Sequence, residues 1–255
     1  MNSLQDAFNF SGRTALVTGG SKGIGRSVVM GLAQLGAQVV YTCRKQDDSA
    51  RSLQTWAQEA GYNVSNLICD SLDPHAYPSF FSRFQTISSA LDILVNNVGD
   101  VLRRSSFLDS DDQLWQDTLN INLLSTVRMT KAMLPLLIQS DHAVIINVSS
   151  IAAKSSGAPD SLHYGVSKAA LDTLTIGLAK ELGEKGIRVV GVGPSAIDTD
   201  FQTRHSSESR LQKVVAQTPL GRIGLPDEVA NTILFLASSA ANYISGDTVM
   251  ITGGR

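Results

Sequence analysis

The chain has 255 residues, is 43% hydrophobic and carries a formal net charge of −2 at pH 7. This near-neutral balance gives no electrostatic basis for nucleic acid or an anionic membrane as the main partner, and no apolar run reaches the roughly 20 residues that span a bilayer. The length supports a single hydrophobic core. We therefore expect one domain over residues 11–255, preceded by a short N-terminal tail over residues 1–10.

Short apolar runs alternate with longer amphipathic segments along the whole chain. The runs are rich in Val and Ile and predict strands that are buried on both faces. They cover residues 14–18, 38–43, 64–69, 91–96, 143–148, 187–193 and 248–252. The intervening segments predict helices near 24–35, 49–60, 74–88, 111–139, 162–185 and 226–239. This alternation predicts an α/β fold with a doubly wound parallel sheet and helices on both of its faces.

One stretch, residues 195–217, departs from this pattern. It is polar and only weakly periodic, so we expect a mobile lid over the substrate.

A glycine-rich turn occupies the first predicted strand-to-helix junction. It reads Thr18-Gly19-Gly20-Ser21-Lys22-Gly23-Ile24-Gly25. Gly19 permits a tight turn, while Gly23 and Gly25 let the backbone approach a pyrophosphate and the helix approach the strand. Such a pattern alone also fits a purely structural turn. Its position between a strand and a helix favours dinucleotide binding.

The residues after the second predicted strand bear on which dinucleotide is bound. A carboxylate there would hold the adenosine ribose of NAD, but none occurs before Asp47. Arg44 and Lys22 instead bring positive charge to where the 2′-phosphate of NADP would lie. Each alone also fits a solvated surface charge, but together they predict NADP(H). Asp70, after the third strand, either accepts from the adenine amino group or belongs to a turn.

Tyr164 and Lys168 are four residues apart in a predicted helix, so they share one helical face. A lysine beside a tyrosine stabilises the phenolate and lowers the tyrosine pKa toward working pH. A tyrosine of this kind can exchange a proton with a carbonyl or alcohol oxygen. The pair alone also fits an amphipathic surface helix. Together with a dinucleotide turn, it predicts alcohol–carbonyl oxidoreductase chemistry.

In order and spacing, these motifs resemble those of the short-chain dehydrogenase/reductase family along nearly the full chain. The resemblance rests on the glycine-rich turn, Asn96-Asn97-Val98-Gly99, Asn122, Ser150, Tyr164, Lys168, Gly221-Arg222-Ile223-Gly224-Leu225-Pro226 and Gly253-Gly254. The pattern is similar to that of 3-oxoacyl-carrier-protein reductases and related NADPH carbonyl and sugar reductases. It implies a Rossmann-like sheet of seven strands and a homotetramer assembled through the two longest predicted helices.

The resemblance also implies a role for each matching residue. Tyr164 would donate the proton in reduction, Lys168 would lower the tyrosine pKa and hold the nicotinamide ribose, and Ser150 would hydrogen-bond the substrate carbonyl. Asn122 would hold a water that links Lys168 to solvent. The residues implied to bind the cofactor are Gly19, Ser21, Lys22, Gly23, Ile24, Gly25, Arg44, Asp70, Ser71, Asn97, Gly99, Tyr164, Lys168, Pro194, Ile197 and Thr199.

Two positions depart from the family pattern. Ser195 follows Pro194 where the family usually has glycine, so its side chain could alter the backbone beside the nicotinamide or narrow the pocket. Val98 replaces a usual alanine, which is a modest change in packing.

Cysteine and histidine usage bears on compartment and metals. Cys43 and Cys69 lie in apolar runs, so we expect two buried free thiols in a reducing, cytoplasmic compartment. The start of the chain has no basic patch followed by an apolar run, so no signal peptide is expected. The four histidines show no paired ligand spacing, so no metal site is expected.

Three functions are compatible with these residues. The first is NADP(H)-dependent reduction of a carbonyl to a secondary alcohol, and the second is NAD-dependent oxidation of a sugar, polyol or secondary alcohol. The third, a non-enzymatic dinucleotide-sensing protein, is disfavoured by the intact catalytic set.

The substrate is either free or bound to an acidic carrier protein, which would need a basic docking surface. Arg103 and Arg104 could supply that surface, but Asp141, Glu181 and Glu184 weaken it. We therefore expect a small free carbonyl or alcohol substrate.

Overall fold

The computed structural model describes residues 4–255, whose centre is a seven-stranded sheet in the order β3-β2-β1-β4-β5-β6-β7. Every neighbouring pair of strands is parallel. The strands are β1 Thr14–Val17, β2 Gln38–Cys43, β3 Val64–Ile68, β4 Ile93–Asn96, β5 Val144–Val148, β6 Arg188–Pro194 and β7 Thr248–Ile251. The predicted α/β fold with seven parallel strands is confirmed.

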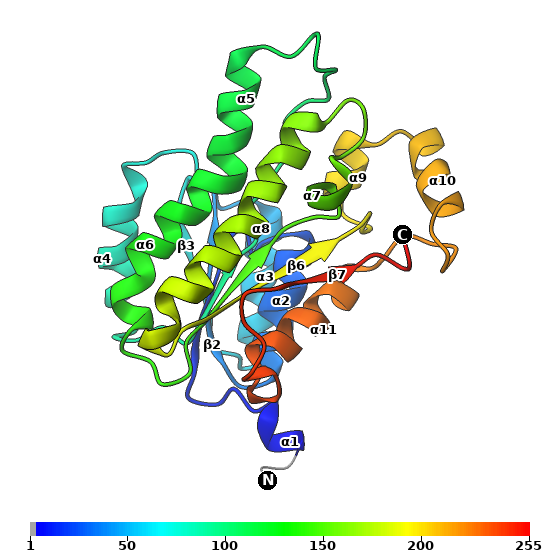
Figure 1. Ribbon diagram of the computed structural model, residues 1–255. Helices are drawn as coiled ribbons and strands as arrows, with labels where there is room; N and C mark the ends of the chain where they lie inside the picture. The colour runs from blue at the N-terminus through cyan, green and yellow to red at the C-terminus, as the bar shows by residue number, and fades with distance from the viewer. Residues whose placement is uncertain (1–3) are drawn as a thin grey trace.

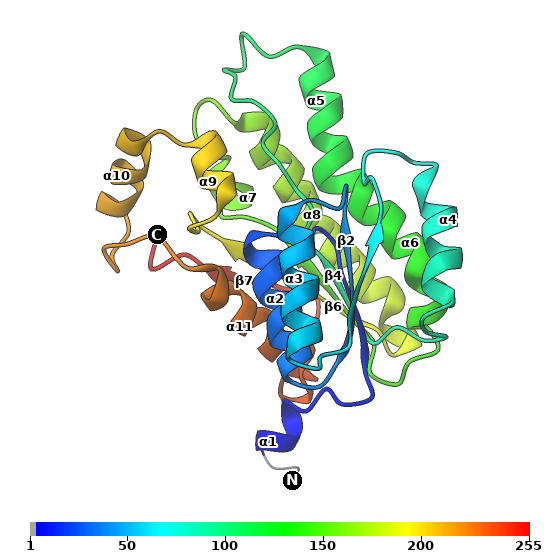
Figure 2. The ribbon, with the colours of Figure 1, turned by 180° about the vertical axis from the view of Figure 1, so that it is seen from behind.

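Helices cover both faces of the sheet (Figure 1; Figure 2). One layer consists of α2 Gly23–Gln34, α3 Asp48–Glu59 and α11 Pro226–Ala237, and the other of α4 Ala76–Gln85, α6 Ser125–Leu137 and α8 Leu162–Leu182. Successive strand residues point to opposite faces, so Val17 packs in the core under α2 whereas Leu16 packs in the core under α4 and α6. Burial on both sides explains why the strands are continuous apolar runs rather than alternating ones.

The N-terminal segment packs against this sheet rather than trailing from it. Within the predicted tail, residues 1–3 lie outside the described residues, and α1 spans Leu4–Ala7. Phe10 is completely buried among the side chains of the α2–α11 core, and its backbone N–H donates to the Leu35 carbonyl at 2.9 Å. The end of the predicted tail is therefore anchored to the domain, because burial of the Phe10 ring removes its apolar surface from water.

The predicted long helix over 111–139 is interrupted by a wider turn. It consists of α5 Asp112–Leu119, a π-helical turn over Asn120–Leu124, and α6. At this turn the Asn122 side chain donates to the Thr118 carbonyl at 3.0 Å, four residues earlier, where a backbone N–H would donate in an α-helix. π-turns of this kind are frequent at functional sites.

The stretch predicted as a lid holds two short helices, α9 Asp200–His205 and α10 Glu208–Ala216. Ser207 caps α10 by accepting from the Arg210 backbone N–H. These helices, together with α1 and α7 Ala152–Ser155, have no counterpart in the predicted elements because each is too short to show an apolar period. The two remaining short turns are 3₁₀ helices over Gly183–Lys185 and Ser239–Ala241.

The strand order determines where a site can form. The chain proceeds outward from β1 through β2 to β3, then returns to the centre and continues through β4 toward β7. The connections after β1 and β4 therefore diverge and leave a crevice at the carboxyl ends of these two strands, where open parallel sheets bind ligands. No helix within residues 4–255 is long and apolar enough to cross a membrane.

Candidate functional site

A cavity of about 860 Å³ lies at the carboxyl ends of the central strands. The predicted residues that line it are Gly19, Ser21, Lys22, Gly23, Ile24, Arg44, Asp70, Ser71, Asn97, Gly99, Ser150, Tyr164, Lys168, Pro194, Ile197 and Thr199. Two predicted residues, Gly25 and Asn122, are absent from its lining. The fold thus brings together segments that are as much as 180 residues apart, the difference between positions 19 and 199.

The glycine-rich turn forms one wall of the cavity. Gly19 and Gly23 have φ angles of +64° and +50°, which side chains rarely tolerate. Lys22 precedes α2 without a side-chain cap, so the first backbone N–H groups of this helix have no capping side chain and can bind phosphate. A Cβ at Gly25 would lie 2.4 Å from the Gly19 carbonyl oxygen and 2.6 Å from Asn97 Nδ2, so Gly25 keeps the helix close to the turn.

Ser150, Tyr164 and Lys168 form the opposite wall. Ser150 follows β5 and accepts from the Ala152 backbone N–H at 3.1 Å. On α8, Lys168 Nζ lies 5.8 Å from the centroid of the Tyr164 ring and donates to the Val148 carbonyl at 2.9 Å. The last carbonyl of β5 therefore positions the lysine beside the tyrosine.

Burial controls the titration of this pair. Burial raises the pKa of Tyr164 to about 12, although hydrogen bonding with Ser150 opposes the shift. Burial also lowers the pKa of Lys168 to about 8. The sequence predicted that Lys168 would lower the tyrosine pKa; that contribution stays a prediction, while burial sets the net direction of the shift. The reason is that removal from water penalises the charged forms of both groups.

Asn122 is completely buried and binds the backbone of the segment that follows β4. Its Nδ2 donates to the Asp100 carbonyl at 2.8 Å, and its Oδ1 accepts from the Asp100 backbone N–H at 3.0 Å. A Cβ on Gly99 would lie 2.7 Å from this Oδ1 and 2.9 Å from Lys168 Nζ. The side chain of Asn122 thus fixes the segment after β4 against Lys168, and its predicted water contact stays a prediction.

The charged side chains that follow β2 and β3 differ in how they are paired. Arg44 is exposed and makes no hydrogen bond or ion pair with the described part of the chain. Lys22 Nζ pairs with Asp47 at 3.0 Å, and this pairing holds the pKa of Asp47 below its usual range. The Asp70 carboxylate accepts from the Leu72 backbone N–H at 3.0 Å, so it stabilises the turn after β3.

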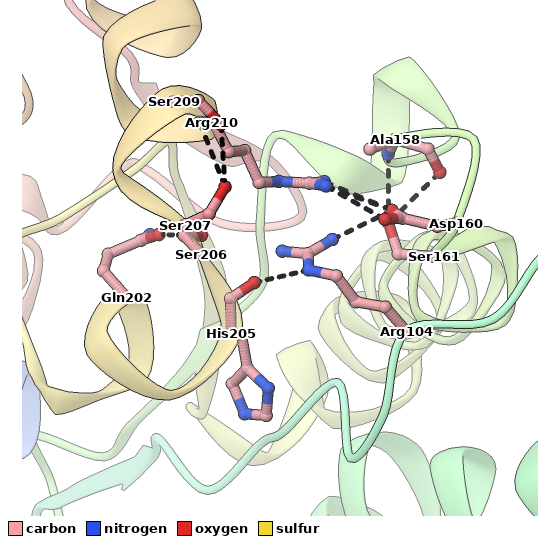
Figure 3. Close-up of polar contacts among 10 residues, drawn as sticks. All are labelled: Arg104, Ala158, Asp160, Ser161, Gln202, His205, Ser206, Ser207, Ser209 and Arg210. Atoms are coloured by element: carbon pink, nitrogen blue, oxygen red, sulfur yellow. Dashed lines mark hydrogen bonds and ion pairs between the residues drawn. The ribbon is translucent and has the colours of Figure 1, made fainter.

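The cavity is also lined by residues that the sequence did not identify as part of the site. Phe201, Arg204 and Arg210 from the α9–α10 segment line the cavity, and so does Arg104. The sequence suggested Arg104 only as docking surface, whereas in the fold its guanidinium donates to the His205 carbonyl of α9 (Figure 3). No local pattern distinguishes it from Arg103, whose guanidinium pairs with Asp111 outside the cavity lining.

Ser195, the departure from the family pattern, lies at the cavity wall. Its Oγ accepts from the guanidinium of Arg255 at 3.5 Å. Arg255 lines the cavity as well. Cys43 and Cys69 are both buried and free, as predicted. Residues 4–255 contain no group of three or more His, Cys, Asp or Glu that could hold a metal ion.

The chain is similar to known proteins along nearly its whole length. A family model described as enoyl-(acyl carrier protein) reductase matches residues 19–255. The 3-oxoacyl-[acyl-carrier-protein] reductase of Escherichia coli K12 is 35% identical over 246 residues, which cover 96% of this chain and 98% of that protein.

Solved structures extend the similarity. A 7α-hydroxysteroid dehydrogenase solved with NADH and 7-oxo glycochenodeoxycholic acid has a TM-score of 0.92 and 30% identity, over 98% of this chain and 96% of the other. A gluconate 5-dehydrogenase from Burkholderia cenocepacia, solved with NADP and tartrate, has a TM-score of 0.90 and 28% identity, over 98% and 97% of the two chains.

Lys168 is expected to link the stability of the fold to pH. Its folded pKa of about 8 lies below its ordinary value of 10.5, so the unfolded chain binds more protons between these values. The buried charge destabilises the fold fully below about pH 8, and this cost disappears as the pH rises toward the unfolded pKa. Urea unfolding between about pH 7 and 10 should therefore show a Lys168-dependent rise in the free energy of unfolding.

Lys168→Met should remove this rise. Lys180→Met, at an exposed position of the same helix, should retain it. Identical pH dependence in the wild type and Lys168→Met would contradict the assignment.

Proposed function

The chain belongs to the short-chain dehydrogenase/reductase family and is an oxidoreductase of CH–OH and C=O groups, and from this premise we propose that it reduces a carbonyl to a secondary alcohol with NADP(H), Tyr164 being the proton donor. The observation that carries this proposal is the convergence of Ser150, Tyr164 and Lys168 on one cavity that also contains the glycine-rich turn. Related proteins include a 3-oxoacyl-[acyl-carrier-protein] reductase and a gluconate 5-dehydrogenase.

The residues around the cavity fit a dinucleotide. The left-handed glycines Gly19 and Gly23 leave room for a pyrophosphate, and the uncapped start of α2 offers backbone N–H donors. Pro194, Ile197 and Thr199 line the cavity next to the catalytic wall, where the nicotinamide would be held. When bound, NADPH supplies the hydride.

In the proposed mechanism, the chain's own residues handle the oxygen and the proton. The Ser150 hydroxyl donates to the substrate carbonyl oxygen and stabilises the charge that develops there. Because burial raises the pKa of Tyr164 to about 12, its phenol is protonated at neutral pH and can act as the acid. Lys168, held by the Val148 carbonyl, stabilises the phenolate that remains. We propose that a water beside Asn122 returns the proton through Lys168.

The cofactor preference rests on Arg44. Arg44 and its neighbour Lys45 both line this wall, and neither forms an ion pair with a carboxylate of the described residues. The planar guanidinium of Arg44 is the better suited of the two to bind the 2′-phosphate of NADP. Lys22 contributes less than its charge suggests, because Asp47 shares it.

NAD-dependent oxidation of a sugar, polyol or secondary alcohol is a second candidate. The Lys22–Asp47 ion pair favours it, since a carboxylate in this region can hydrogen-bond a ribose. The catalytic residues are the same in both candidates, and cofactor kinetics separate them.

We further propose a small free substrate and a cytoplasmic location. Docking of an acidic carrier protein would need unpaired basic side chains around the entrance. Arg103 pairs with Asp111 and Arg104 with Asp160, which leaves little basic surface for a carrier.

Tyr164→Phe tests the mechanism because it removes one hydroxyl and keeps the ring. Turnover of a panel of ketones with NADPH should fall by roughly two to four decades, the usual worth of general acid catalysis. Binding of NADPH, followed by fluorescence, should persist. Tyr243→Phe is the matched control, since Tyr243 is fully exposed on the surface. A Tyr164→Phe enzyme with near-normal turnover would show that the proton comes from another group.

Arg44→Asp tests the cofactor preference. The wild type should use NADPH with a higher kcat/KM than NADH. The variant should reverse this order, because it removes the phosphate contact and adds repulsion. Arg51→Asp places the same charge change on α3, away from the cavity lining, and should leave the order unchanged. Equal use of both cofactors by the wild type would refute the preference.

The long helices are proposed to form the homotetramer. The small-residue face of α8 is free in the single chain: Thr173 is exposed, and a Cβ on Gly177 would meet no atom within 4 Å. Val166 and Ile176 on the same helix are 42% and 44% exposed, which suits an interface. Light scattering at micromolar concentration should give a tetramer, and Thr173→Arg should give smaller species. A monomeric wild type would rule this assembly out.

A further inference from the structure

The loop before α5 and the α9–α10 segment cover one end of the cavity and are called its roof below. Two arginines of this roof share a carboxylate partner that lies outside the cavity lining. Arg104, from the loop between β4 and α5, and Arg210, from α10, both line the cavity, whereas Asp160 does not. Both guanidiniums pair with Asp160, at 3.1 and 3.0 Å (Figure 3). Asp160 therefore orients the two arginines without occupying the cavity.

The charges of Arg104, Arg210 and Asp160 do not sum to zero. Two arginines share one aspartate, which leaves one unit of positive charge. A third arginine, Arg204 of α9, pairs with Asp100 at 2.7 Å and adds no net charge. The other charged residues that line the roof, Asp200 and Arg255, are of opposite sign.

Of these arginines, Arg104 has a guanidinium nitrogen that is free to bind a ligand. Its Nε donates to the His205 carbonyl and its Nη1 to Asp160, while its Nη2 makes no hydrogen bond with any described residue. The side chain is only 24% exposed. Burial, and next the neighbouring Arg210, lower the pKa of Arg104, so an anion at Nη2 would relieve both effects.

A short series of rings connects this arginine to the proton donor. The His205 ring lies 4.9 Å from the Phe201 ring, which in turn lies 6.2 Å from the Tyr164 ring. Arg104 and Tyr164 line the same cavity, and they are near enough that the guanidinium charge opposes the burial-driven rise in the pKa of Tyr164. A small molecule can therefore reach Arg104 with one end while its carbonyl lies at Tyr164.

We propose that the substrate is an oxo acid, and that Arg104 binds its carboxylate and thereby selects it. This inference rests on the proposed reductase function and names the substrate class for it. A carboxylate carries the single negative charge that the group lacks, and it matches the planar guanidinium. A phosphate would bring about two charges at neutral pH, more than the group can balance. A neutral ketone would leave the Nη2 of Arg104 without a charged acceptor.

The test compares acids with neutral analogues of nearly the same shape. Initial rates with NADPH are measured for 3-oxobutanoate, 4-oxopentanoate and 5-oxohexanoate, and for the methyl ester of each. The wild type should prefer at least one acid to its ester in kcat/KM. Arg104→Gln should reduce this preference by about 10- to 100-fold, the worth of a charge-assisted hydrogen bond, mainly through KM for the acid. Arg104→Lys, which keeps the charge, should retain part of it.

Arg103→Gln is the matched control, because Arg103 pairs with Asp111 and does not line the cavity. It should leave the acid-to-ester ratio unchanged. A merely structural role for Arg104 would lower the rates of acid and ester equally, and this result would overturn the assignment. So would a wild type that uses the esters as well as the acids, or one that prefers dihydroxyacetone phosphate to dihydroxyacetone and shows no preference for the acids.

Failure of the proposed function has a different signature, namely no turnover of any acid, ester or ketone with either cofactor. In that case, 4-oxopentanoate in the presence of NADP⁺ should still raise the Tm of the wild type more than that of Arg104→Gln. Equal shifts in the two proteins would overturn the inference independently of catalysis.

Discussion

The site depends on the junction where β1 and β4 end side by side. Thr18 Oγ1 accepts from the backbone N–H groups of Asn97 and Val98, at 2.9 and 3.2 Å. The Asn97 side chain donates back to the carbonyls of Thr18 and Gly19. Two strands distant in sequence are thereby joined at the point where their connections diverge. Because this junction holds the glycine-rich turn and the segment leading to Asp100 in register, both walls of the cavity depend on it.

The opposite wall is built around a buried charge. Lys168 is only 2% exposed, a placement that costs free energy unless its protons find acceptors. The last carbonyl of β5 is one acceptor, and Gly99 keeps the space beside Lys168 open for close contact with Asn122. The fold thus accepts a destabilising lysine at the place where the proposed mechanism needs its charge beside Tyr164. Active sites commonly hold such strain because the remaining structure supports it.

The roof is held by weaker interactions than the walls. The ion pairs of Arg104, Arg204 and Arg210 are partly exposed, and such pairs contribute little to stability individually. No residue of α9 or α10 is fully buried. Weak attachment is consistent with a segment that opens for substrate, while the shared aspartate keeps the guanidiniums oriented.

The sequence by itself determined the strands, the main helices and the residue types of the catalytic wall, because periodicity, glycine conformation and helical spacing act over a few neighbouring residues. Tertiary structure alone decided the rest. Arg104 faces the cavity while Arg103 faces away, since Asp160 and His205 approach only in the folded chain. Likewise, burial rather than the neighbouring lysine sets the direction of the Tyr164 pKa shift. Solvent exclusion and long-range pairing depend on segments far apart in the chain, and no local pattern encodes them.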